Sequence, residues 1–249
     1  MRSDPVTIET ADGAADAYFV RPSADGPHPG VLFLMDAIGL RPRLREMADR
    51  IATAGYAVLV PNLFYRNGTA PLVDVGDLLN PANRPTMMAT LGPFFATLTP
   101  DRAISDFGYY LDFLGKQEGV NTGPVGVTGY CFGGAHAVRA AGAYGDRIAA
   151  AASFHGGNLA TDAAGSPHLL AGGISASVYI AHADNDPSAS PEQQERLNSA
   201  LDAAGVDYRA EVYTGAQHGF TMTDTAAYNP AAEERHWTEL LALFDRAVR

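Results

Sequence analysis

Three residues that together could perform nucleophilic catalysis follow one another along the chain, each just after a predicted strand. The first, Cys131, is the only cysteine and lies in the run GYCFGG, between a buried-strand pattern over 125–130 and an Ala-rich helical pattern. A nucleophile on such a sharp strand-to-helix turn has a strained backbone, so Gly129 and Gly133 supply the small neighbours that it needs. The positive end of the following helix favours a thiolate at Cys131.

The acid and the base of this chemistry are predicted from chain order. Asp186 begins the loop after the predicted strand 178–183, and Asp184, two residues earlier, is the alternative acid. His218 lies in a Gly-flanked loop after the alternating strand 208–213, from which an imidazole can reach the carboxyl edge of a parallel sheet. The order nucleophile, acid, histidine is that of α/β hydrolases, and it predicts a triad of Cys131, His218 and Asp186.

At these motifs the chain resembles a known family. The runs GYCFGG, NDP and YTGAQHGF, together with VLFLMDA and AGYAVLVP nearer the N-terminus, resemble the dienelactone hydrolase family over nearly the whole chain. This family is a cysteine branch of the α/β hydrolases. The resemblance implies an α/β fold, with a mainly parallel sheet of about eight strands and helices on both faces. It also implies hydrolysis of lactones and esters, with the triad mapped onto Cys131, His218 and Asp186.

Two positions depart from the family pattern. Family members carry a glutamate at the end of the first core strand, where it modulates the resting thiol. This chain has Asp36 there, one methylene shorter, and we expect the same role for it. Members also bind a substrate carboxylate with arginines. One of those positions is Met222 here, and Arg84 and Arg102 are the candidates for the other.

The predicted reaction is hydrolysis of an ester or lactone of a small carboxylic acid through a thioester on Cys131. The backbone N–H groups of Phe132 and Ala37 are the expected oxyanion donors. The alternative is a redox-sensing or ligand-binding protein on the same fold, which would use a reactive Cys131 without needing the histidine relay. The histidines lack metal-ligand spacing, so we predict no metal and no cofactor.

Composition limits the class of partner. The chain has 17 basic and 28 acidic residues, a net charge of −11, which argues against nucleic acid and anionic membranes and leaves a small-molecule substrate. A single cysteine cannot form an internal disulfide, and the N-terminus lacks an apolar leader, so we expect a cytoplasmic protein. No apolar run is long enough to span a membrane. The sequence assigns no oligomeric state.

The elements that must position these residues read as one continuous alternation of strands and helices, so we predict a single domain over 1–249. Core strands are expected at 31–35, 58–60 and 148–154, and helices at 42–54, 101–114, 191–204 and 231–248. The segment 66–100 contains five prolines and no clear periodicity. We expect it to be an irregular lid or substrate-shaping segment at the active-site edge.

Overall fold

Eight strands form one sheet, in the order β1-β2-β4-β3-β5-β6-β7-β8, in the computed structural model, which describes residues 1–73 and 84–249. The strands are β1 (Arg2–Thr10), β2 (Gly13–Arg21), β3 (Gly30–Leu34), β4 (Ala57–Pro61), β5 (Val125–Tyr130), β6 (Ile148–Phe154), β7 (Ser177–Ala183) and β8 (Tyr208–Tyr213). β1 pairs antiparallel with β2 and β2 with β4, and all pairs from β4 to β8 are parallel. The predicted mainly parallel sheet is confirmed.

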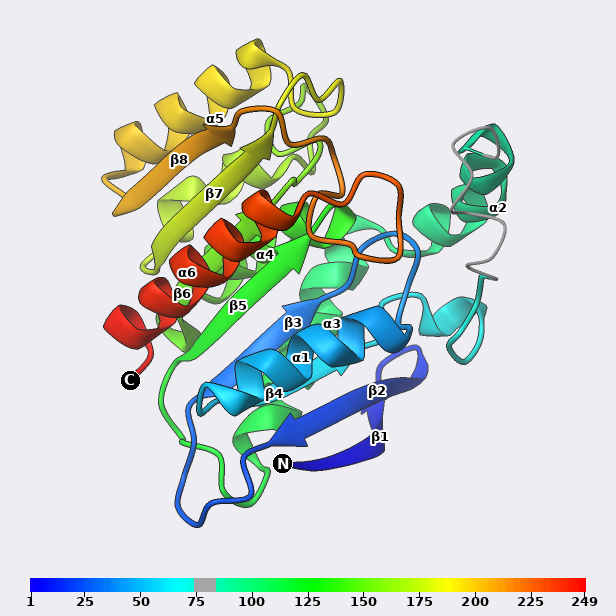
Figure 1. Cartoon of the computed structure of the whole chain (residues 1–249), viewed down its shortest axis with the longest axis vertical. Coiled ribbons are helices and arrows are strands. Elements are labelled where there is room, and N and C mark those ends of the chain that lie inside the picture. Colours follow the sequence, from blue (N-terminus) through cyan, green and yellow to red (C-terminus); the bar gives the residue numbers. More distant parts are fainter. Residues whose placement is uncertain (74–83) are drawn as a thin grey trace.

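Helices cover both faces of this sheet (Figure 1). They are α1 (Pro42–Thr53), α2 (Arg84–Thr97), α3 (Pro100–Gly115), α4 (Phe132–Tyr144), α5 (Pro191–Ala204) and α6 (Pro230–Ala247). α1 and α6 lie in front of the sheet in Figure 1, and α3 and α4 lie behind it. Among the described residues, no helix is both long and apolar enough to cross a membrane.

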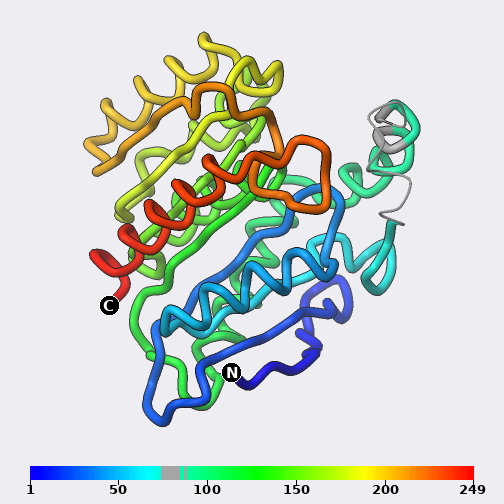
Figure 2. The backbone as a smooth tube through the Cα atoms, in the orientation of Figure 1, coloured from blue at the N-terminus to red at the C-terminus, as the bar shows by residue number. Residues whose placement is uncertain are grey.

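The centre of the sheet explains why the sequence pattern there is apolar without alternation. Every residue of β3, β4 and β5 is buried, because helices cover the sheet on both sides. Because β3 to β8 are parallel, their carboxyl ends meet at one edge of the sheet, and the loops that follow these strands gather there. Figure 2 shows the loop after β3 next to the loop between β8 and α6 at this edge.

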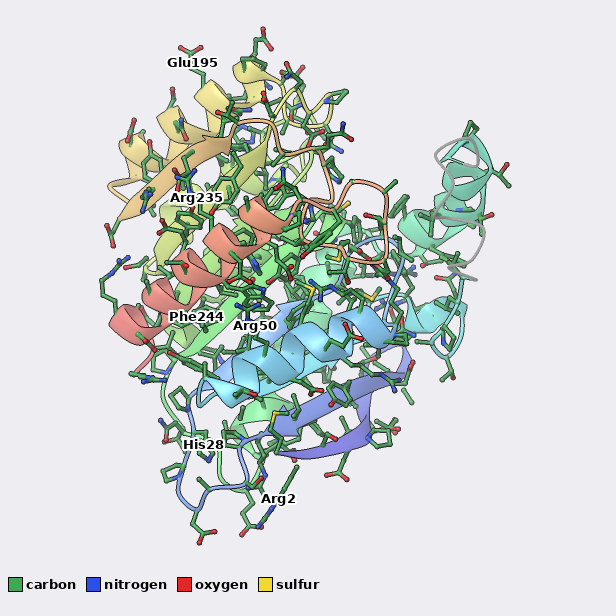
Figure 3. All side chains as sticks on the ribbon, in the orientation of Figure 1. Arg2, His28, Arg50, Glu195, Arg235 and Phe244 are labelled. Carbon is green, nitrogen blue, oxygen red and sulfur yellow. The ribbon has the colours of Figure 1, made fainter. Side chains whose placement is uncertain are left out.

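The two helices on the front face are joined by side chains. Arg50 of α1, labelled in Figure 3, points toward α6. It pairs with Glu234 of α6, and its guanidinium lies 4.5 Å from the ring centroid of Trp237. On the same helix, Phe244 packs over Gly126 of β5, where a Cβ atom would lie 2.8 Å from the Phe244 ring. The small residue in the central strand thus lets α6 approach the sheet closely.

The segment 66–100 is more regular than its prolines predicted. Residues 74–83 lie outside the described part of the chain, but Tyr65–Asn67 forms a 3₁₀ turn and α2 occupies Arg84–Thr97. Pro85 is the second residue of α2, where the missing N–H has no helical acceptor to lose. Pro93 is inside the helix and removes one backbone hydrogen bond. The expectation of an irregular segment was therefore wrong for α2, which projects beyond the sheet in Figure 1.

Candidate active site

Cys131 lies on the turn between β5 and α4, with φ 55° and ψ −116°. A positive φ is costly for a residue other than glycine and persists only where the surroundings impose it. The flanking glycines allow it. A Cβ atom at Gly129 would lie 2.0 Å from the carbonyl oxygen of Gly133, and one at Gly133 would lie 2.2 Å from that of Leu34. The chain can make this turn only with glycine at both positions.

Asp186 and His218 form a direct pair at the same edge. Asp186 follows β7, and its Oδ2 lies 2.6 Å from Nδ1 of His218, in the loop after β8. The other carboxylate oxygen of Asp186 accepts hydrogen bonds from the backbone N–H and the hydroxyl of Ser188, at 2.9 and 2.7 Å. Two donors of Ser188 therefore hold the aspartate while it orients the imidazole.

The charges of this pair support one another. Burial opposes the charged form of His218, but the charge of Cys131 and the hydrogen bond to Asp186 outweigh burial and raise its pKa to about 10. Burial also opposes the charged form of Asp186, but the hydrogen bond and charge of His218 lower its pKa to about 2. Both shifts favour a charged pair, an imidazolium at His218 and a carboxylate at Asp186.

Asp184, the alternative acid, has a different set of contacts. Its carboxylate accepts hydrogen bonds from the backbone N–H of Gly215 at 2.8 Å and from the side chain of Asn185 at 3.0 Å. It thereby fixes the turn after β8, from which the His218 loop departs. Of the two aspartates, Asp186 is the one that contacts the histidine.

A second histidine, His155, is hydrogen-bonded to the backbone of the Cys131 turn. The Nδ1 atom of His155, which is fully buried, accepts a hydrogen bond from the backbone N–H of Cys131 at 3.1 Å. The proton must then be on Nε2, which donates to the hydroxyl of Thr221 at 2.8 Å. Burial first, and then the charge of His218, hold the pKa of His155 well below its usual value. The ring is therefore a neutral support for the turn.

A cavity of about 620 Å³ opens at these residues, and Cys131, His218 and His155 lie in its wall. Ala37 and Phe132, the expected oxyanion donors, line the same cavity. Its other walls come from α2 and the start of α3 on one side and from the loops after β6, β7 and β8 on the other. They include Leu91, Phe95, Leu98, Pro100, Gly157, Asn158, Ser188 and Met222.

The carboxylate of Asp36 faces an arginine. Both of its oxygens accept hydrogen bonds from Arg41, at 2.7 and 2.9 Å, and Arg41 also donates to Asp224, at 2.6 and 3.2 Å. The guanidinium lies 3.5 Å from the sulfur of Met222. This ion cluster joins the loop after β3 to the loop before α6. The thiol-modulating role of Asp36 stays a prediction.

Of the two arginines that the sequence suggested for a substrate carboxylate, the structure describes the side chain of one, Arg102. Arg102 is exposed on α3 and interacts with Asp12 and with the carbonyl of Thr97, and the side chain of Arg84 lies outside the described residues. Sequence reasoning missed Arg139, which lines the cavity, and Arg41 behind its wall. Arg139 follows Phe132 by seven residues, so helical periodicity was an available signal for it. Arg41 and Asp224 are 183 residues apart and gave none.

Comparison with known proteins identifies the family to which this chain is similar. The family model that matches, over residues 15–248, is the dienelactone hydrolase family. A relative from Salmonella typhi, provisionally named carboxymethylenebutenolidase, is 26% identical over 258 residues, covering 96% of this chain and 91% of the relative. One from Escherichia coli K12 with the same provisional name is also 26% identical, covering 92% and 81%.

Two solved structures extend the comparison. A dienelactone hydrolase-like promiscuous phosphotriesterase from metagenomic libraries is 26% identical, has a TM-score of 0.82 and covers both chains fully. A Klebsiella pneumoniae protein, provisionally assigned as a dienelactone hydrolase, has a TM-score of 0.84 at 24% identity, covers 98% of both chains and so shares the fold. With the family model spanning nearly all of the sheet and its helices, the chain belongs to the dienelactone hydrolase family and is a hydrolase.

Proposed function

We propose that this hydrolase cleaves carboxylic esters or lactones through a thioester on Cys131. The observation that carries the proposal is the contact between Asp186 and His218 beside the strained Cys131 turn, at the wall of an apolar cavity. The provisional name of the Salmonella and Escherichia relatives, a butenolide hydrolase, supports the lactone part of this class. A nucleophile, a base and a group that orients the base are the parts that acyl transfer needs.

In the first half-reaction, the Cys131 thiolate attacks the carbonyl carbon and the carbonyl oxygen becomes an oxyanion. Backbone N–H groups of Phe132 and Ala37 would stabilise that charge, an interaction worth on the order of a hundredfold or more in rate per donor. The tetrahedral intermediate collapses as the bond to the alkoxide breaks, and His218 gives its proton to the alkoxide. A thioester on Cys131 and a neutral His218 remain.

In the second half-reaction, His218 takes a proton from water, and the resulting hydroxide attacks the thioester carbonyl. Collapse releases the carboxylic acid and returns the thiolate and the imidazolium. Asp186 keeps the imidazole in one tautomer and orientation through both steps, because its Oδ2 accepts the Nδ1 proton. The cycle consumes one water and requires no other co-reactant.

In this proposal the chain is a single domain, and the segment 66–100 shapes its substrate site. Leu91 and Phe95 of α2 and Leu98 after it line the cavity opposite α4. Phe95 lies against Phe132, with ring centroids 5.0 Å apart. A substrate bound at Cys131 would therefore contact apolar side chains from this segment.

The test is acid-quenched intact mass spectrometry after brief mixing with p-nitrophenyl acetate. We expect one acetyl group on the wild-type protein, which disappears with time, and none on Cys131→Ala. His218→Ala is the matched control for the base, and we expect it to lose turnover. An acetyl group that persists on the wild-type protein contradicts hydrolysis and favours the reactive-thiol alternative. A Cys131→Ala protein that hydrolyses the ester as fast as the wild type contradicts the nucleophile.

A further inference from the structure

One face of α4 forms a continuous wall of the cavity. Phe132, Ala135, His136 and Arg139 all line it, and their spacing of three, four and seven residues places them on one side of a helix. The cavity therefore runs along α4, away from the cysteine. At 1.5 Å per residue, the backbone of Arg139 is about 12 Å from that of Cys131 along the helix axis. Helical side chains lean toward the N-terminus, so the guanidinium lies somewhat nearer to Cys131 than the backbone does.

Arg139 is a buried cation that has no acidic partner among the described residues. It is 7% exposed, and its Nη1 donates to Nδ1 of His136 at 3.0 Å while Nη2 donates to the carbonyl of Gly165 at 2.8 Å. Its Nε atom is buried and has no hydrogen-bond partner within the described residues. In that same part of the chain, no carboxylate lies within ion-pair distance of the guanidinium.

The described neighbours of Arg139 add no negative charge. His136, its nearest polar neighbour, is neutral, because burial first and the charge of Arg139 second hold its pKa well below the usual value. Buried arginines are otherwise almost always paired, because an isolated charge loses its hydration without compensation. A cation at the wall of an apolar cavity, with unused N–H donors, is the arrangement that a bound anion would complete.

We propose that Arg139 binds a carboxylate of the substrate at the end of the cavity remote from Cys131. The substrates would then be esters or lactones whose acyl chain carries a carboxylate, separated from the reacting carbonyl by an apolar stretch. Phe132, Phe95, Leu91 and Leu98 would contact that stretch. This inference rests on the proposed function, since it places the reacting carbonyl at Cys131. The planar guanidinium fork suits a carboxylate better than a neutral acceptor.

A matched pair of esters tests the proposal. Mono-p-nitrophenyl suberate carries the distal carboxylate, and its methyl ester has the same chain without the charge. We expect wild-type kcat/KM to favour the acid, and Arg139→Met to lower the ratio of the two kcat/KM values by about tenfold or more. Arg102→Met is the control, because that arginine is exposed and outside the cavity, and its ratio should equal that of the wild type.

The ratio separates binding of the carboxylate from a structural role. If Arg139 only holds α4 and the Gly165 loop, both esters should slow together in Arg139→Met and the ratio should stay unchanged, which overturns the proposal. A wild-type enzyme that prefers the neutral ester also overturns it.

A binding measurement keeps the subsite independent of the chemistry. Suberate should raise the melting temperature of Cys131→Ala, and this stabilisation should be lost in Cys131→Ala/Arg139→Met. If neither ester is hydrolysed but suberate still binds through Arg139, the proposed reaction fails and the carboxylate subsite stands. If suberate stabilises both variants equally, or neither, the subsite is wrong.

Discussion

Two buried arginines lie near the active site, and their surroundings are opposite. Arg41, 3% exposed, is held between Asp36 and Asp224 behind the cavity wall, whereas Arg139, 7% exposed, faces the cavity without a carboxylate among the described residues. Burial lowers the pKa of both. For Arg41 the charges of Asp36 and Asp224 and their hydrogen bonds reverse this effect and raise the pKa, whereas for Arg139 burial alone acts.

The difference separates two uses of the same side chain. Arg41 joins the loop after β3, which contains Ala37, to the loop before α6, so its partners belong to the protein. Within the described residues, Arg139 has a neutral imidazole and a carbonyl as its hydrogen-bond partners, and in our proposal a ligand supplies the missing negative charge. Removing the first should harm the fold, and removing the second should harm recognition. The predictions below test that division.

The largest effect is expected for Arg41→Met. The substitution leaves the buried Asp36 carboxylate without its cation and should lower the free energy of unfolding by about 3–5 kcal/mol. Urea denaturation measures this change, with Arg102→Met, at an exposed ion pair, as the control that should change it by at most about 1 kcal/mol. An equal loss in the two variants would show that the Arg41 cluster is no more than a surface ion pair.

The pair of Asp186 and His218 should show a different pH dependence from the Arg41 cluster, because its cation titrates. The pKa of Asp186 is lowered from 3.8 to about 2, so its stabilisation is present above 3.8 and lost as the pH falls through 2. The pKa of His218 is raised from 6.5 to about 10, so its stabilisation is present below 6.5 and lost as the pH rises through 10.

Asp186→Asn should therefore lower the melting temperature most between pH 3.8 and pH 6.5, the ordinary pKa values of the two groups. The difference in melting temperature from the wild type should shrink at lower and at higher pH. Thermal unfolding across this pH range measures it. A wild-type advantage that keeps growing above pH 10 would contradict an imidazolium at His218. For Arg41→Met, the difference in melting temperature from the wild type should not decline at alkaline pH, since the Arg41 guanidinium of the wild type stays charged.

The sheet and the positions of Cys131, Asp186 and His218 at its carboxyl edge could be predicted from the sequence because their signals are local. Buried strands such as β5 carry uninterrupted apolar residues, and the Cys131 turn needs glycines at fixed offsets. The order of Asp186 and His218 after their strands follows from the parallel sheet, which brings those loops to one edge. Side chains within a few residues of a strand end could thus be assigned before the structure.

What could not be read depends on contacts between distant segments. Nothing near Arg41 in the sequence indicates Asp224, and nothing near Asp36 indicates that both of its oxygens accept hydrogen bonds from Arg41. α2 was read as irregular because Pro85 and Pro93 were treated alike, although Pro85 is at a position where proline fits a helix. Arg139 was read as part of an Ala-rich helix, and only the cavity along α4 gives it significance.

A smaller effect is expected for Asp224→Asn. Asp224 is partly exposed, and Arg41 would keep both hydrogen bonds to Asp36. The asparagine oxygen can still accept a hydrogen bond, so the free energy of unfolding should fall by only about 1 kcal/mol. Comparing urea denaturation of this variant with Asp36→Asn tells which carboxylate neutralises Arg41. A larger loss for Asp224→Asn would identify Asp224 as the main partner.

The smallest effect on stability is expected for Arg139→Met. Its hydrogen bonds to His136 and Gly165 are lost, but so is the cost of burying a cation without a carboxylate, and methionine fits an apolar wall. The free energy of unfolding should therefore change by less than about 1 kcal/mol in either direction, measured by urea denaturation without ligand. A loss as large as that of Arg41→Met would make Arg139 a second structural clamp. A small change in the free energy of unfolding, together with the loss of stabilisation by suberate, would show that the charge of Arg139 serves ligand binding and not stability.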